Sequence, residues 1–260
     1  SAANALQIRD KAYIDGKFVS ATSGKVFECI NPATDAVLAT VAECDAADVD
    51  RAVKAARAAF ESGVWSAMAP MNRKAVLLRL AELIRQNLVE LALLDSLDMG
   101  KLVNDAAMVD VPGSATFFQW YAEAIDKVYD EIAPTGPGDL AMITREPLGV
   151  VGAVVPWNFP LDMATWKCAA ALAAGNSVVL KPAEQSPLSA LRLAELAFLR
   201  QALVQILLGQ LLLQLSPWVG VGGEGQGRWA RLLVGMWARG RGRVGVWACG
   251  RVGVWARAHG

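Results

Sequence analysis

Two short apolar runs separated by a helical segment constrain the fold of this chain more than any other feature. The first run, 148–155, is rich in valine, and a second run follows at 177–180. Short runs of β-branched residues are typical of strands buried on both faces. The segment between them, 161–174, is rich in alanine and precedes Gly175 and Asn176, which commonly end helices. The pattern predicts a strand–loop–helix–strand unit with parallel strands.

Polar side chains follow both predicted strands. Pro156 and Pro160 require a loop after the first strand, because proline cannot donate to the ladder of a central strand. Asn158 lies between them, and Lys181 and Glu184 follow the second strand. In open parallel sheets, ligands bind at the carboxyl ends of the strands. The sequence therefore predicts a binding site with an amide donor, a cation and a carboxylate.

The first half of the chain predicts supporting elements. Residues 13–19 place Asp-Gly between apolar pairs, which indicates a hairpin. Asp45 suits the N-cap of a helix over 45–60, and leucine spacing predicts a helix over 71–98 that is broken once. A further helix is expected over 114–128. We assign these elements to the scaffold.

The motifs PWNFP and WKCAAALAAGNSVVLKPAEQSP resemble the cofactor-binding core of the aldehyde dehydrogenase superfamily. The resemblance runs from about residue 13 to 197 and covers less than half of a usual member. It is closest in character to γ-glutamylaminobutyraldehyde and broad-specificity members. It implies an α/β fold with a partial Rossmann-like parallel sheet and flanking helices. It also implies NAD-dependent oxidation of an aldehyde to a carboxylic acid.

The resemblance assigns roles to individual residues. Asn158 matches the asparagine whose amide donates to the developing oxyanion, and Lys167 matches a lysine near the proton-relay path. The alternatives are that Asn158 only caps a loop and that Lys167 is a surface lysine of the helix.

The same comparison implies a cofactor site. Pro156, Trp157 and Asn158 belong to its loop, although Trp157 is also a plausible packing residue. Lys181 and Glu184 match the pair that holds the adenosine ribose. A carboxylate accepts hydrogen bonds from both ribose hydroxyls and repels a 2′-phosphate, so Glu184 favours NAD over NADP.

The chain lacks the rest of the family's catalytic machinery. The glycine-rich motif of the nucleophilic cysteine, the Leu-Glu-Leu-Gly-Gly context of the general base and the glycine-serine turn near the pyrophosphate do not occur. Cys168 is expected to be packing filler, and Cys249 lacks the flanking pattern. The scattered cysteines and the single His259 predict no metal site. No signal peptide is recognisable at the start, so a cytoplasmic location is expected.

Four segments are expected. Residues 1–127 form the N-terminal wrap and the helical part of the cofactor-binding domain, and 148–199 form its βαβ core. Between them, 128–147 are expected to be a β-hairpin arm, which in the family pairs with another subunit. Residues 200–260 form a tail rich in glycine, arginine and tryptophan, outside the resemblance. Ser186 and Pro187 suit the N-cap and first position of a helix within the core.

The tail differs in charge from the rest of the chain. Residues 1–199 carry 17 basic and 24 acidic side chains, net −7, whereas 200–260 carry eight arginines and one glutamate, net +7. An apolar helix is expected over 201–223, and GRVGVWA occurs at 242–248 and again at 250–256. Our preferred interpretation is a GC-rich gene read out of frame.

Three functional hypotheses follow. The first is an inactive fragment of an aldehyde dehydrogenase, whose partners by family are NAD, an aldehyde and further copies of the chain. The second is a non-catalytic NAD-binding or subunit-interaction module. The third, which we favour least, is a basic Trp/Arg tail that binds nucleic acid or an anionic membrane.

Overall fold

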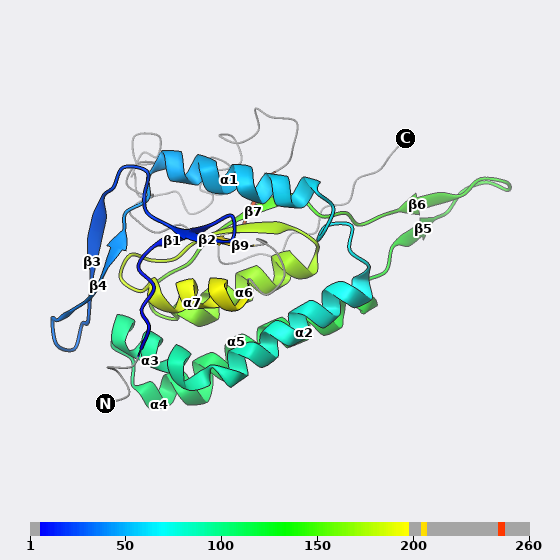
Figure 1. The fold of residues 1–260 in the computed structure, drawn as a ribbon. Coiled ribbons are helices and arrows are strands. Elements are labelled where there is room, and N and C mark those ends of the chain that lie inside the picture. The colour runs from blue at the N-terminus through cyan, green and yellow to red at the C-terminus, as the bar shows by residue number, and fades with distance from the viewer. Residues whose placement is uncertain (1–5, 198–203, 207–243, 248–260) are drawn as a thin grey trace, which may run out of the picture.

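The computed structural model describes residues 6–197, 204–206 and 244–247 as an α/β arrangement (Figure 1). A six-stranded sheet in the order β10-β7-β8-β9-β1-β2 forms its centre. The pairs β10–β7, β7–β8 and β8–β9 are parallel, and β1 runs antiparallel to both β9 and β2. The strands of this sheet are β1 (Ala12–Ile14), β2 (Lys17–Val19), β7 (Val150–Val154), β8 (Ser177–Lys181), β9 (Val204–Ile206) and β10 (Val244–Trp247).

Helices cover both faces of the sheet. Figure 1 shows α1 on one side, α6 and α7 on the other, and α2, α3 and α5 as an outer layer beyond them. The main core lies between α6, α7 and this outer layer, and includes Phe118, Leu161 and Leu191. The helices are α1 (Ala46–Glu61), α2 (Pro70–Gln86), α3 (Leu88–Met99), α4 (Val103–Asp105), α5 (Val111–Ala124), α6 (Pro160–Ala173) and α7 (Leu188–Ala197).

The predicted strand–loop–helix–strand unit is confirmed. β7 and β8 pair in parallel over five residues, from Val150 opposite Ser177 to Val154 opposite Lys181. Gly175 ends α6 at a φ of 89°, in the left-handed region that favours glycine. Asn176 then fastens the helix end to β7, because its Oδ1 accepts from the Gly149 amide at 2.9 Å.

The scaffold predictions hold with one correction. Residues 13–19 form the β1–β2 hairpin, Asp45 caps α1, and the helix over 71–98 is broken at Asn87. The predicted start of the next helix at 114 is wrong. The helical path already begins at α4 and passes through a π-helical turn, Ala106–Asp110, into α5. The π turn carries the helix past Pro112, which has no amide hydrogen to donate.

The predicted cap of the helix after β8 is also wrong. α7 begins at Leu188, whose amide donates to Asp98 Oδ2 at 2.8 Å. The Ser186 hydroxyl donates instead to the Trp157 carbonyl at 3.4 Å. A carboxylate 90 residues earlier in the chain therefore takes the role that local sequence assigns to Ser186.

Part of the tail contributes to the sheet. Residues 204–206 form β9 against β8, where an apolar helix was expected, because the alternating Val204 and Ile206 suit a strand and find a partner edge. The stretch 244–247, from the first GRVGVWA copy, pairs with β7 as β10. The other expectations for 200–260 lie outside the described residues.

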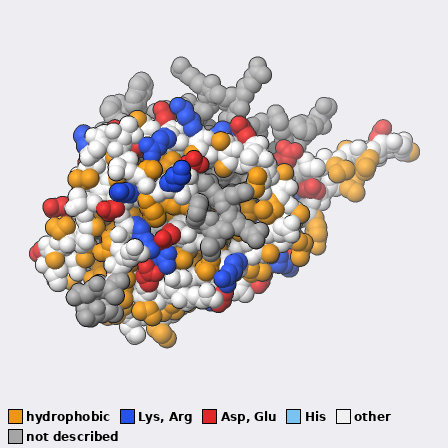
Figure 2. Space-filling model, viewed as in Figure 1, with side chains coloured by type: hydrophobic (Ala, Val, Ile, Leu, Met, Phe, Trp, Pro, Cys, Tyr) orange, Lys and Arg blue, Asp and Glu red, His pale blue; other side chains and the backbone are white. Residues whose placement is uncertain are grey.

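Two small antiparallel sheets lie apart from the central one. One is β3 (Val26–Ile30) with β4 (Val37–Ala42). The other is the predicted hairpin, β5 (Glu131–Ala133) with β6 (Ala141–Ile143), which projects as an arm (Figure 1). Figure 2 shows hydrophobic side chains along this arm, where Ile132, Leu140 and Met142 are exposed.

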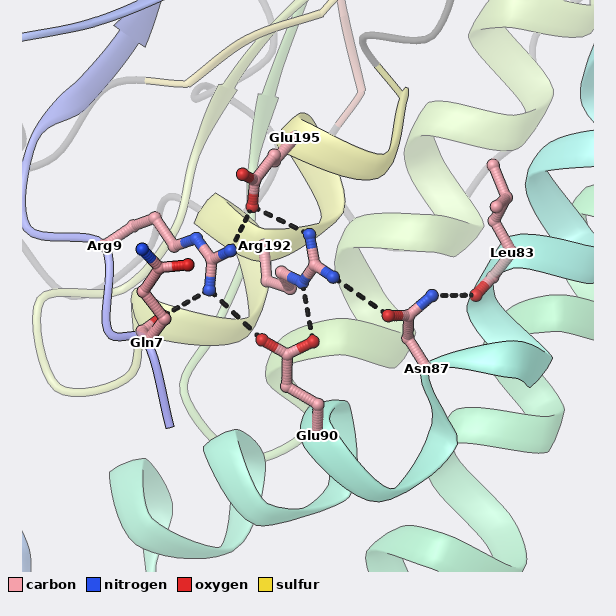
Figure 3. Close-up of polar contacts among 7 residues, drawn as sticks. All are labelled: Gln7, Arg9, Leu83, Asn87, Glu90, Arg192 and Glu195. Carbon is pink, nitrogen blue, oxygen red and sulfur yellow. Dashed lines mark hydrogen bonds and ion pairs between the residues drawn. The ribbon is translucent and has the colours of Figure 1, made fainter. Parts of the chain in front are cut away.

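A charged network joins the N-terminal segment to the outer helices (Figure 3). Arg192 on α7 binds Glu90 at 2.8 Å, Glu195 at 2.7 Å and the Asn87 side chain at 2.9 Å. Arg9 reaches the same two carboxylates, at 3.1 Å to Glu90 and 2.6 Å to Glu195. Both arginines are largely buried, so solvent screens these pairs less than surface ion pairs.

Replacement of Arg192 by Met should lower the free energy of unfolding by about 1–3 kcal/mol, because several charge-assisted hydrogen bonds are lost together. Urea unfolding measures this change. Arg85→Met is the control, because Arg85 forms a more exposed pair with Glu82 at 3.9 Å. Its effect should stay within about 0.5 kcal/mol. Equal losses in the two variants would contradict the proposed importance of the network.

Candidate functional site

The parallel pairing of β7 and β8 brings the two predicted loops to one edge of the sheet. The pairing continues past the strands, since the Val155 amide donates to the Lys181 carbonyl at 3.1 Å. The first loop leads into α6 at Pro160, and Ser186 joins the second loop to the Trp157 carbonyl. The residues placed at this edge by sequence therefore do lie together.

The ribose-type pair is formed. Lys181 Nζ and Glu184 Oε1 make a close ion pair. The Lys181 side chain is 6% exposed, whereas that of Glu184 is 24% exposed, so the carboxylate is the member that a ligand can reach. Glu184 and Trp157 line a cleft of about 510 Å³ against the β3–β4 sheet. Its other lining residues are Phe27, Glu28, Ile30, Pro32, Glu43, Asp98, Met99 and Gln185.

The remaining predicted residues lie outside this cleft. Pro156 and Asn158 are exposed on the loop after β7, and neither lines the cleft. Lys167 lies on α6, about two turns beyond the loop, and is half-buried. The structure thus groups Trp157 with Glu184 and Lys181, and leaves Asn158 and Lys167 on the adjoining α6 side.

The described cysteines are poor nucleophiles. Cys29, Cys44 and Cys168 are all free and buried. Burial raises the pKa of Cys168 to about 12, although Lys167 lowers it slightly. Burial and the neighbouring Asp98 carboxylate also raise the pKa of Cys29 strongly. A thiol must ionise to attack a carbonyl, so these positions disfavour nucleophilic catalysis. Cys249 lies outside the described residues.

Sequence analysis missed the carboxylate that joins the cleft to the core. Asp98 is 2% exposed and accepts from Cys29 Sγ at 2.7 Å and from the Leu188 amide. Burial raises its pKa to about 7, an effect that these two donors partly oppose. A signal was available, because Asp98 follows Leu91 and Leu94 at helical spacing, on the side of the helix that is buried.

Lys101 supports the loop that carries Asn158, and it too was missed. Its ammonium pairs closely with Asp110, which is 2% exposed, and lies 3.7 Å from the centre of the Phe159 ring. A cation over an aromatic face is attractive, and more so when it is shielded from water. The interaction therefore holds the residue directly after Asn158 against the helical layer.

Comparison with known proteins identifies the family. The family model described as "Aldehyde dehydrogenase family" matches residues 18–209. The chain belongs to the aldehyde dehydrogenase family. Over 192 residues it is 53% identical to the NADP/NAD-dependent aldehyde dehydrogenase PuuC of Escherichia coli K12 and 54% identical to the aminoacetaldehyde dehydrogenase of Pseudomonas aeruginosa. Each alignment covers 74% of this chain and 39% of the relative.

Solved aldehyde dehydrogenases share the fold. An indole-3-acetaldehyde dehydrogenase in complex with NAD+ is 53% identical, with a TM-score of 0.79 over 80% of this chain and 43% of that one. The γ-glutamyl-γ-aminobutyraldehyde dehydrogenase of Burkholderia cenocepacia gives 53% and 0.78 over the same shares. The chain spans about two fifths of the length of the relatives it matches. Within the described residues, no helix is long and apolar enough to cross a membrane.

A buried acid near the site makes stability depend on pH. Asp95 is fully buried, and neither carboxylate oxygen makes a hydrogen bond of normal geometry within the described part of the chain. Burial raises its pKa from 3.8 to about 7. Between these values the folded protein holds a proton that the unfolded chain has released, so the contribution of Asp95 to stability falls as pH rises.

Asp95→Asn should remove this dependence, because an amide does not titrate. The stability of the variant relative to wild type should rise by on the order of 1–3 kcal/mol between pH 4 and pH 8. Urea unfolding at several pH values measures the difference. A difference that stays constant over this range would contradict the raised pKa.

Proposed function

We propose that this chain is the N-terminal, cofactor-binding part of an NAD-dependent aldehyde dehydrogenase and does not itself oxidise aldehydes. The observation that carries this proposal is the Lys181–Glu184 pair, which lines a cleft at the carboxyl end of β8. The chain has no counterpart of the family's cysteine and glutamate motifs. The described thiols are buried and hard to ionise.

The residues present fit the adenosine part of NAD. Glu184 offers a partly exposed carboxylate to two ribose hydroxyls, and buried Lys181 keeps that carboxylate charged and oriented. Trp157 adds an aromatic wall to the cleft, and Pro156 shapes the loop. Bound NAD would supply the hydride acceptor of the family reaction.

The loop after β7 would supply the polar group of the reaction. Exposed on this loop, Asn158 would donate its amide to an oxyanion, and Lys101 would hold the loop through the Phe159 ring. Lys167 would lie further along α6 and help to move the released proton. These roles require the remaining three fifths of a family member, which holds the nucleophile and the base.

Self-association through the arm is the second part of the proposal. The β5–β6 hairpin projects from the body and exposes Ile132, Leu140 and Met142. An isolated two-stranded ribbon is marginally stable in water, so a partner strand or surface would stabilise it. This feature also supports the alternative of a non-catalytic subunit-interaction module. A cytoplasmic location is part of the proposal and agrees with the reduced thiols.

The tail offers less support for nucleic-acid or membrane binding. One copy of its repeat, at 244–247, lies within the central sheet as β10, so this segment is not a free basic arm. The second copy lies outside the described residues.

Glu184→Gln should weaken NAD binding and reduce discrimination against NADP. Loss of the charge removes both the ribose acceptor and the repulsion of the 2′-phosphate, so the ratio of the two dissociation constants should move about tenfold toward one. Titration calorimetry with NAD and NADP measures it. The control is Glu82→Gln, because Glu82 forms a similarly spaced pair with Arg85 away from the cleft. No NAD binding by wild type would refute the proposed site.

Purified chain mixed with NAD and propanal should form no NADH. Absorbance at the NADH band, after the mass of the chain is verified, provides the measurement. Iodoacetamide should also label Cys168 only slowly at pH 8, because its thiol remains protonated. Turnover that survives repurification and is lost in Cys168→Ser would show that this thiol is active after all.

A further inference from the structure

A carboxylate with no assigned role lies beside the Asn158 loop. Asp162 is in the first turn of α6, four residues after Asn158, and its side chain is half-buried. No cation of the described residues forms an ion pair with it, because the nearby Lys101 is already engaged by Asp110 and the Phe159 ring. An uncompensated, partly buried charge is unfavourable for folding, so it calls for another explanation.

The neighbouring helix leaves room for this carboxylate. A Cβ atom at Gly113 on α5 would lie only 3.1 Å from Asp162 Oδ1. The single polar contact from α5 is weak, since Ser114 Oγ lies 3.4 Å from the same oxygen. The seam between α5 and α6 therefore accommodates the carboxylate without satisfying it.

An aromatic pair continues the same seam. Trp166 follows Asp162 by four residues on α6, and Phe117 follows Gly113 by four residues on α5. Their rings stack with centroids 5.4 Å apart and planes inclined by 8°. Residues four apart share one helix face, so the stacked rings lie one turn from the carboxylate. Trp166 remains 45% exposed, and part of its surface is free to contact a ligand.

The charges around Asp162 select for a cation. Burial and the Asp110 carboxylate raise its pKa to about 6, while Ser114 and Lys101 act in the opposite direction. The group therefore remains mostly ionised at neutral pH. A half-buried carboxylate next to an exposed aromatic face suits an alkylammonium ion, which gains an ion pair and a cation–π contact together.

We propose that Asp162, with the Trp166–Phe117 pair, binds the cationic amino group of the substrate, which is therefore an aminoaldehyde. This inference rests on the proposed function, because it places the aldehyde carbon near Asn158. The four-residue separation along the chain puts the ammonium group a few carbon atoms from the aldehyde. Asp162 is accordingly a specificity-determining residue of the loop–α6 side of the site.

A structural explanation makes a different prediction. An acidic residue in the first turn of a helix is stabilised by the helix dipole. If that is its only role, Asp162→Asn changes stability but leaves ligand binding unchanged. Binding of a substrate-like amine therefore distinguishes the two explanations.

The test uses the full chain and 4-aminobutanamide, a stable probe that carries both a carbonyl and an ammonium group. Butanamide is the neutral probe of the same length. The indole NMR signal of Trp166, assigned with Trp166→Phe, should shift saturably with the amine and not with butanamide. Asp162→Asn should weaken amine binding about tenfold, and Phe117→Leu about threefold.

Glu123→Gln is the matched control, because Glu123 is an exposed acid on α5 outside the seam. Its affinity for the amine should equal that of wild type. Equal binding of the two probes, unchanged affinity in Asp162→Asn, the same loss in Glu123→Gln, or no saturable shift would each overturn the inference. NAD titration of the same samples separates the hypotheses: retained NAD binding without amine binding refutes only the aminoaldehyde, whereas absent NAD binding refutes the proposed function.

Discussion

Parallel pairing between β7 and β8 positions everything else that bears on function. The five-residue register sets Val154 opposite Lys181, and the Val155 amide extends the pairing by one bond. Both strands therefore end at the same edge, and their two loops lie side by side. A shift by one residue would turn every side chain of a strand to the opposite face. The buried packing of both strands prevents such a shift, so the loops inherit a fixed relative position.

Buried charges then fix the loops at that edge, at some cost to stability. Asp98 joins β3 to the start of α7, and Lys101 joins Asp110 to the Phe159 ring. Asp95 has no compensating partner of normal geometry among the described residues, and burial raises the pKa of both Asp95 and Asp98. Removing such charges from water is unfavourable unless they are paired. Their concentration around the strand ends agrees with a functional region more than with an ordinary core.

The chain presents parts of a site that a larger protein would complete. It spans about two fifths of the length of its relatives, and its cleft and α6 seam lie at separate sides of one loop. Trp157, Phe159 and Trp166 remain exposed around that loop. Exposed aromatic residues next to polar groups are typical of surfaces that another chain segment or a ligand covers. The proposed cofactor site and the proposed amine site are thus compatible.

Local sequence determined the elements whose signals are short-ranged. The valine runs, Gly175, the Asp-Gly turn and the Asp45 cap each specify backbone geometry within a few residues, and all were predicted. The Lys181–Glu184 pair was also accessible, because its members are three residues apart after one strand. Tertiary structure alone decided the cap of α7 by Asp98, the clamp of Phe159 by Lys101 and the meeting of Asp162 with Gly113. These contacts join distant segments, and no local pattern encodes which buried charge will face which loop once the helices pack.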